Sequence, residues 1–267
     1  MKKYLIILLA LILLTPSLAF SGILTFKVGF FIPQAQSDLW DIEFENMNFG
    51  KTHFYNSNFA FSYEYFLTKE LSFTIGVDSY TKNKGGIYEN YFGVYGSVFG
   101  IADDLAFPNG YEEDFFSDEM FNIFHSFSVS ITPIQFSLKL TPLGRKGKMI
   151  PYIGGGVGVY LWYVRIRGDM ADFNDTSYTY YDPVLDADIP VYPVYYTDAR
   201  EDSRITIGYH GFAGMMVPVA QRFSIEVELK YNYVQGKFKE GADASFEGFD
   251  PFDLSGYQLS VGLNYWF

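Results

Sequence analysis

Cysteine is absent from all 267 residues of the chain. This absence excludes a disulfide framework, and it excludes the modified cysteine that anchors a lipoprotein. An exported protein with this composition must gain its stability from side-chain burial and backbone pairing alone.

Long hydrophobic runs are absent too, except at the amino terminus. MKKYLIILLALILLTPSLAFS carries Lys2 and Lys3, an apolar run of about 11 residues, and small residues at Ser17-Leu18-Ala19. Because a spanning helix needs about 20 apolar residues, the pattern favours a signal peptide at residues 1–21 over a membrane anchor. The remainder, 22–267, is predicted to be one domain. If it crosses a membrane, it must do so as a β-barrel.

Positive charge is scarce, with 19 Lys and Arg against 31 Asp and Glu, a formal net charge of -12. Removal of the signal peptide takes away two lysines and makes the balance more negative. Nucleic acid is therefore excluded as a partner, because phosphate binding needs basic patches.

Aromatic residues are abundant instead, at 20% of the chain. They fall in about eight segments in which every second residue is apolar, and this alternation predicts strands. The segments are LTFKVGFFI, NFAFSYEYFL, LSFTIGVDSY, FSVSITPIQFSLKL, PYIGGGVGVYLWYV, RITIGYHGFAGMMV, RFSIEVELKYNYV and YQLSVGLNYWF. In the fourth segment the apolar residues change parity at Thr132-Pro133, where a β-bulge would return both halves to one face.

The connections between these segments alternate in length. Short connections at 68–70, 143–149 and 218–221 separate long ones at 33–56, 81–124, 168–203 and 237–253. Outer-membrane barrels have short periplasmic turns and long external loops. The sequence thus predicts an all-β fold, an eight-stranded antiparallel up-and-down transmembrane β-barrel with long extracellular loops, in the outer membrane.

The two faces of these strands differ in chemistry. The apolar face is nearly unbroken and suits lipid, whereas the other face carries charges that would be costly to bury without partners. The polar and charged residues predicted to face the lumen are Lys27, Glu64, Asp78, Lys139, Arg204, His210, Glu226, Glu228 and Lys230. They could form a binding or ion-selective lining, or a salt-bridge plug. The plug is favoured, because side chains just fill an eight-stranded barrel.

A second inward-facing set combines glycines and aromatic residues. It consists of Gly154, Gly156, Gly158, Tyr160, Trp162 and Phe212. The glycines could leave a lumen cavity beside the rings, or they could let the sheet bend and compensate for the bulk of the rings. The sequence leaves both interpretations open.

The segments NFAFSYEYFLTKELSFTIGVD and PYIGGGVGVYLWY, together with the chain end, resemble the outer-membrane protein W-like group and the wider superfamily of outer-membrane β-barrel domains. The last eight residues resemble the signal that the barrel-assembly machinery recognises, through Ser260, Gly262, Tyr265 and Phe267. The resemblance implies insertion by that machinery. It also implies that small hydrophobic solutes enter the outer half of the barrel.

Catalysis is not expected. Lipid-modifying barrels resemble this chain in size and use His with Ser or Asp near the rim, but His125 and Ser128 differ in parity and point to opposite faces of a regular strand. The acidic loops lack the spacing of a calcium-binding loop, so they are predicted to be solvated and to hold no metal, and no cofactor motif is present.

These observations support three hypotheses about function. The leading one is a narrow conduit or binding site for small hydrophobic solutes. The second is a structural or adhesive barrel acting through its long acidic, Tyr-rich loops, the third of which is the best candidate. The third is a lipid-modifying enzyme. The partners expected are lipopolysaccharide, phospholipid, the assembly machinery and, for the first hypothesis, the solutes.

Overall fold

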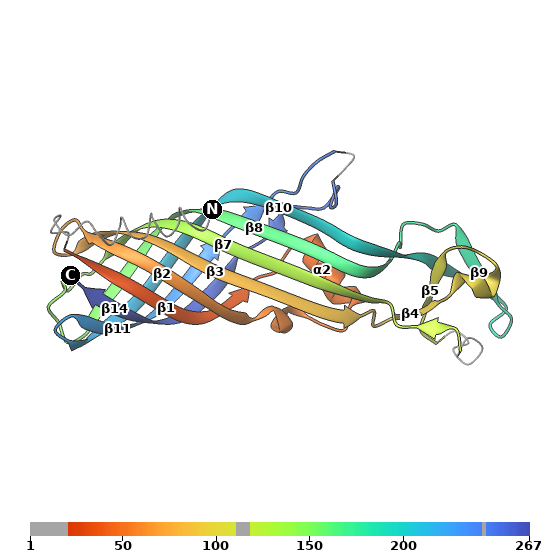
Figure 1. The fold of residues 1–267 in the computed structure, drawn as a ribbon, viewed down its shortest axis with the longest axis horizontal. Helices are drawn as coiled ribbons and strands as arrows, with labels where there is room; N and C mark the ends of the chain where they lie inside the picture. Colours follow the sequence, from red (N-terminus) through yellow and green to blue (C-terminus); the bar gives the residue numbers. More distant parts are fainter. Residues whose placement is uncertain (1–20, 111–117, 242–243) are drawn as a thin grey trace, which may run out of the picture.

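A closed ring of eight antiparallel strands forms the body of the protein. The computed structural model describes residues 21–110, 118–241 and 244–267. The predicted signal peptide lies outside these residues apart from its last position. The ring strands, in order, are β1 (Gly22–Pro33), β2 (Asn56–Phe66), β3 (Leu71–Ile87), β7 (Phe124–Leu140), β8 (Ile150–Ala171), β10 (Ala187–Ala220), β11 (Phe223–Tyr233) and β14 (Gly256–Trp266). Pairing of β14 with β1 closes the ring, so the predicted fold class is confirmed (Figure 1).

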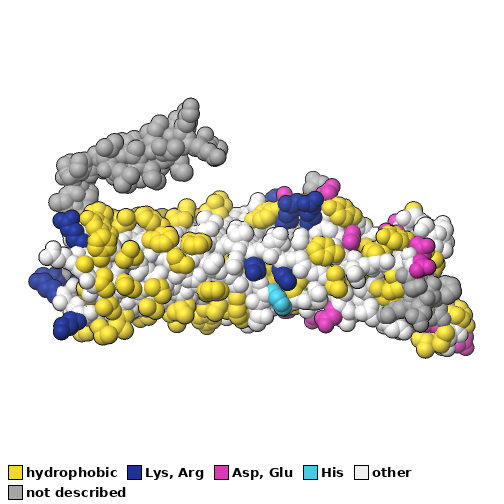
Figure 2. Space-filling view, turned by 60° about the horizontal axis from the view of Figure 1, so that its bottom comes forward, with side chains coloured by type: hydrophobic (Ala, Val, Ile, Leu, Met, Phe, Trp, Pro, Cys, Tyr) yellow, Lys and Arg dark blue, Asp and Glu magenta, His cyan; other side chains and the backbone are white. Residues whose placement is uncertain are grey.

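An apolar belt covers the outside of this ring. On β14 the outward residues Tyr257, Leu259 and Val261 are about half exposed, while Gln258 and Ser260 between them are buried. Figure 2 shows the hydrophobic side chains gathered over the half of the molecule that carries the short turns. A soluble protein rarely exposes so large an apolar surface, and the belt therefore marks the segment in contact with lipid. None of the described helices is long and apolar enough to cross a membrane.

Strand β7 corrects one prediction. Its pairing with β3 and β8 keeps one register from end to end, so there is no bulge at Thr132-Pro133. Phe127 and Ile131 point inward, whereas Ile134 and Phe136 point outward. The parity of the apolar residues changes because their surroundings change. Toward the strand extension the apolar side chains of β7 point into the ring, and toward the short turns they point outward to lipid.

Four ring strands continue past the belt and form what we call the strand extension, residues 80–87, 124–131, 163–171 and 187–205. Strand β10 is 34 residues long and β8 is 22. At the distal end β10 pairs with β5 (Asp104–Pro108) and β9 (Tyr178–Asp182), and β5 is followed in the sheet by β4 (Tyr91–Val94) and β6 (Met120–Phe121). The predicted loop 168–203 is therefore largely strand, and the predicted loop 81–124 contains the end of β3 together with β4, β5 and β6. The short helix η2 (Gly96–Phe99) lies between β4 and β5.

The first external loop closes over the outer end of the ring. It contains α2 (Asp38–Asn46) and the short helix η1 (Lys51–Phe54). Ser37 occupies the N-cap position, and Asp38 and Asp41 in the first turn complement the helix dipole. The helix buries Leu39 and Trp40 against the ring. The fourth loop adds the small pair β12 (Gln235–Gly236) and β13 (Phe252–Asp253), to which α2 is adjacent.

Candidate functional site

The lumen in the belt region is crossed by a layer of buried ion pairs, which we call the ion-pair layer. Its first part joins β1 to β11. The Nζ atom of Lys27 lies 2.9 Å from Oε1 of Glu226 and 2.7 Å from Oε2 of Glu228. Lys27 occupies an inward position of β1, and Glu226 and Glu228, two residues apart on β11, both point inward. The alternation of side chains along each strand therefore turns all three toward the lumen. Tyr152 of β8 also donates its hydroxyl to Glu228, at 3.1 Å.

The second part of the ion-pair layer joins the remaining walls. Lys139 Nζ lies 2.8 Å from Glu64 Oε2, and Lys230 Nζ lies 2.8 Å from Asp78 Oδ2. Lys230 also donates to Gln135, at 2.8 Å. Charges from five strands therefore neutralise one another inside the ring, which is the arrangement that makes their burial tolerable.

Little space remains among these side chains. The cavity between them measures about 30 Å³, room for about one water molecule. Eight of the nine residues predicted for the lumen are buried there. Arg204 is the exception: it is exposed, because β11 begins to pair with β10 only at Tyr209 and leaves this part of β10 beyond the closed ring.

The structure has no cavity beside Gly154 and Gly158, because aromatic rings occupy that space. A Cβ atom on Gly154 would lie 2.3 Å from the ring of Phe212, and one on Gly158 would lie 2.9 Å from the ring of Tyr160. A Cβ atom on Gly156 would meet the backbone of β7 at 1.9 Å. The glycines therefore let the rings and neighbouring strands approach closely, as in the second of the two interpretations.

An aromatic cluster, the outer aromatic core, fills the ring above the ion-pair layer. The ring of Trp40 lies 4.9 Å from Phe54, 5.0 Å from Phe127 and 5.2 Å from Phe252. Trp162 joins the cluster 6.1 Å from Phe252. Its members come from α2, η1, β7, β8 and β13, so two external loops and the ring wall share one apolar core. Sequence alternation identified only Trp162, and the contribution of the loops was not predicted.

His125 lies in a buried pair that the sequence did not predict. Its Nε2 atom is 2.8 Å from Oε2 of Glu43 on α2, and both side chains are buried. Tyr88 packs against the His125 ring, and burial, followed by the nearby Glu43 carboxylate, raises the pKa of Tyr88. Ser126 and Ser128 lie on the opposite face of the strand, as their parity predicts. His125 therefore fastens the first loop to β7.

Another histidine has a hydroxyl within reach. His210 Nε2 lies 2.7 Å from Ser137 Oγ, inside the ion-pair layer. Its Nδ1 atom has no hydrogen-bond partner among the described residues, so no third group orients the ring as a catalytic triad requires. The cavity beside this pair leaves no room for a substrate. Among the described residues, no cluster of His, Asp or Glu side chains could hold a metal ion.

The chain end forms the last ring strand. Ser260 and Gly262 face the lumen, where a Cβ atom on Gly262 would lie 2.9 Å from Glu226. Tyr265 and Phe267 face outward with their rings 5.0 Å apart. The arrangement leaves the terminal ring accessible, and recognition by the assembly machinery stays a prediction.

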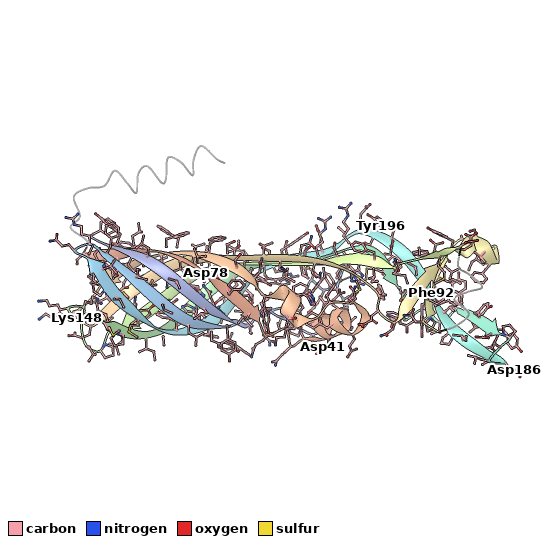
Figure 3. The ribbon with its side chains drawn as sticks, turned by 90° about the horizontal axis from the view of Figure 1, so that it is seen from below. Asp41, Asp78, Phe92, Lys148, Asp186 and Tyr196 are labelled. Carbon is pink, nitrogen blue, oxygen red and sulfur yellow. The ribbon has the colours of Figure 1, made fainter. Side chains whose placement is uncertain are left out.

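The distal end of the strand extension is a small folded unit, which we call the tip. Phe92, Phe107 and Val191 are buried in a core of its own. Figure 3 labels Phe92 and Asp186 toward the end of the molecule opposite to Lys148, and Tyr196 on the strand extension between them and the ring. Tyr181 and Leu185 are exposed on this unit, and Tyr196 is exposed on the adjoining strand extension, where it pairs with Asp169 of β8. The described residues that build it, 88–110, 118–124 and 168–199, contain several Asp and Glu but no Lys or Arg.

Comparison with known proteins supplies relatives in fold only. No protein-family model and no curated protein matches the sequence. Among solved structures, the chain is similar to the outer membrane protein OprG of Pseudomonas aeruginosa, with 9% identity over 93% of this chain and 96% of that chain and a TM-score of 0.48. It is also similar to a major outer membrane protein of Thermus thermophilus, with 12% identity over 92% and 99% and a TM-score of 0.42. Neisserial surface protein A matches with 13% identity over 92% and 97% and a TM-score of 0.40.

These alignments are too distant to transfer an activity, so the assignment rests on the chain's own geometry. A closed ring of antiparallel strands, an unbroken apolar belt outside it and neutralised charges within it leave lipid as the surrounding medium. The chain folds as a small transmembrane β-barrel of the outer-membrane type.

Proposed function

We propose that the protein acts at the cell surface, where the tip of the strand extension recognises a partner and the ring serves as the membrane anchor. The observation that carries the proposal is the contrast between the two ends. The ring is filled with side chains, whereas the extension ends in a folded unit with exposed aromatic residues.

The filled ring weakens the case for a conduit. A solute crossing it would have to displace the outer aromatic core and then separate the charges of the ion-pair layer. Leaving a buried charge without its partner costs about 3–5 kcal/mol. A cavity of about 30 Å³ is also far below the ~300 Å³ at which small-molecule sites begin.

The tip has features of a recognition surface. Tyr181 and Leu185 on the tip, and Tyr196 on the adjoining strand extension, are all more than half exposed, and tyrosine gives large contact area at low entropic cost. The hairpin that bears Tyr181 is fixed by Asp182, which accepts the backbone N–H of Val184 at 2.8 Å. With no basic residue in its segments, the tip fits a cationic polypeptide partner.

The test uses the mature protein in lipid nanodiscs and two immobilised probes, an arginine-rich peptide and poly-L-glutamate. Wild type should bind the first and not the second. Tyr181→Ser/Leu185→Ser/Tyr196→Ser should bind at least tenfold more weakly, because anchors in an interface contribute more than about 1 kcal/mol each. Ile42→Ser removes an exposed apolar residue from α2 and is the matched control.

Two results would count against the proposal. One is equal binding by wild type and the triple variant. The other is stepwise conductance or solute-dependent uptake by wild type in planar bilayers and vesicles, which would restore the conduit hypothesis.

We also propose that the protein is not an enzyme. His125 is engaged by Glu43, and His210 is enclosed in the lumen. Cells that carry His125→Gln should keep the membrane lipid composition of the wild type.

A further inference from the structure

An open depression of about 510 Å³ lies at the short-turn end of the barrel, and the proposed recognition by the tip gives it no role. It opens between the first short turn, residues 67–70, and the second, residues 141–149. Its volume is within the range of about 300–1,000 Å³ that ligand sites occupy. Because the short turns of such barrels face the periplasm, we call it the periplasmic pocket.

The pocket is held in shape by bonds between the two turns. The backbone N–H of Thr141 donates to the carbonyl of Glu70 at 2.7 Å. Arg145 Nη1 donates to the carbonyls of Thr68 and Lys69, at 2.7 and 2.6 Å. A site fixed in this way loses little entropy when it takes up a ligand.

The lining carries three basic residues, Lys69, Arg145 and Lys146, against one exposed carboxylate, Glu70, so its net charge is positive. The Arg145 side chain is 10% exposed, yet its Nε and Nη2 atoms have no hydrogen-bond partner among the described residues. The nearest carboxylate, Glu64, is 3.8 Å away and is already engaged by Lys139. Lys69 and Lys146, both exposed, add two further positive charges to the lining. Figure 2 shows Lys and Arg side chains at this end of the molecule. The pocket therefore favours an anion.

The remaining walls are apolar and continue the membrane belt. Leu143 is 75% exposed and Leu67 is 50% exposed, although both line the pocket. Leu140, at the belt end of β7, is also exposed, on the face that carries Leu138. A chain of lipid that follows the belt would reach Leu67 and Leu143 without a break. The ligand that fits both walls is an anionic amphiphile at the level of the lipid headgroups.

We propose that the periplasmic pocket binds one anionic phospholipid of the periplasmic leaflet. Its phosphate lies against Lys69 and Lys146, within the positive field of Arg145, and an acyl chain lies along Leu67 and Leu143. A free phosphate ion would use the basic residues but not the leucines, and the apolar walls select the lipid.

The experiment is native mass spectrometry of the mature, detergent-solubilised protein titrated with phosphatidylglycerol or phosphatidylcholine. Wild type should form a one-to-one adduct with phosphatidylglycerol. Lys69→Gln/Lys146→Gln should bind it about thirty-fold more weakly, since each lysine near a membrane surface contributes about fivefold. Lys148→Gln lies in the same turn outside the lining and should match wild type. All three lysines are exposed, and heat-modifiable gel migration checks that each variant is folded.

Three outcomes would overturn the proposal. The first is equal affinity of wild type and the double lysine variant for phosphatidylglycerol. The second is equal retention of phosphatidylcholine and phosphatidylglycerol by wild type. The third is displacement of the lipid by millimolar inorganic phosphate together with unchanged lipid binding by Leu143→Gln, which would identify a phosphate site instead.

Discussion

Replacing Lys27 by methionine tests whether the ion-pair layer is a structural plug. Methionine keeps most of the aliphatic stem and removes the charge that lies 2.9 Å from Glu226 and 2.7 Å from Glu228. The two carboxylates are 1% and 3% exposed, so water cannot replace the lost partner.

The expected loss follows from what the carboxylates retain. Breaking a buried ion pair costs about 3–5 kcal/mol because a charge remains without compensation. Here Glu226 still accepts from Asn264 at 3.2 Å, and Glu228 still accepts from Tyr152 at 3.1 Å. Because these bonds remain, we expect the free energy of unfolding to fall by about 3 kcal/mol, the lower end of that range. The triple variant Lys27→Met/Glu226→Gln/Glu228→Gln removes the charges together and should recover to within about 1 kcal/mol of wild type.

Urea unfolding in detergent micelles, followed by tryptophan fluorescence, measures these differences. The slope against urea should not change, since the exposed area on unfolding is the same. Lys148→Met is the control, and as an exposed substitution it should stay within about 0.5 kcal/mol. A loss below about 1 kcal/mol for Lys27→Met would refute the plug. A triple variant as unstable as the single one would show that packing, and not charge, causes the loss.

Three further predictions address other parts of the molecule. Trp40→Ala should cost about 3–5 kcal/mol, because the ring is fully buried in the outer aromatic core, and it should make the first external loop sensitive to protease while the ring resists. Gly154→Ala should cost about 1–3 kcal/mol in thermal unfolding, part of which Phe212→Leu should restore, because the new Cβ atom meets that ring at 2.3 Å. Phe136→Arg on the lipid face of β7 should cost about 2–4 kcal/mol, whereas Ser130→Arg, on the same face beyond the belt, should cost less than about 0.5 kcal/mol. Equal losses at these two positions would contradict the position of the membrane boundary.

The sequence predicted the ring well because its signal is local. Alternation with period two places Glu226, Glu228 and Lys230 on one face without knowledge of any partner, and strand closure then brings Lys27 to them. The same logic failed at Thr132-Pro133. There the change of parity predicts a bulge, but the strand is regular. Alternation of apolar and polar residues does not show whether the apolar side chains face lipid outside the ring or the aromatic core inside it.

The outer part was predicted poorly because its partners are distant in sequence. Trp40 and Phe252 meet only after the first and fourth loops fold over the ring, and neither loop carries a periodic pattern. A local signal for the strand extension was present, however. Val164 and Ile166 continue the alternation of β8, and both are buried. Following that alternation to its end would have assigned the start of the third loop to a strand.

Strand β10 runs from the tip into the membrane ring without a linker, and it is hydrogen-bonded to β8 for most of that length. A force that pulls on the tip is therefore carried along the strand and resisted by many ladder hydrogen bonds at once, in shear. A module tethered by a flexible segment would first stretch that segment and then load its attachment point alone. A load applied to the tip is therefore borne directly by the wall of the barrel.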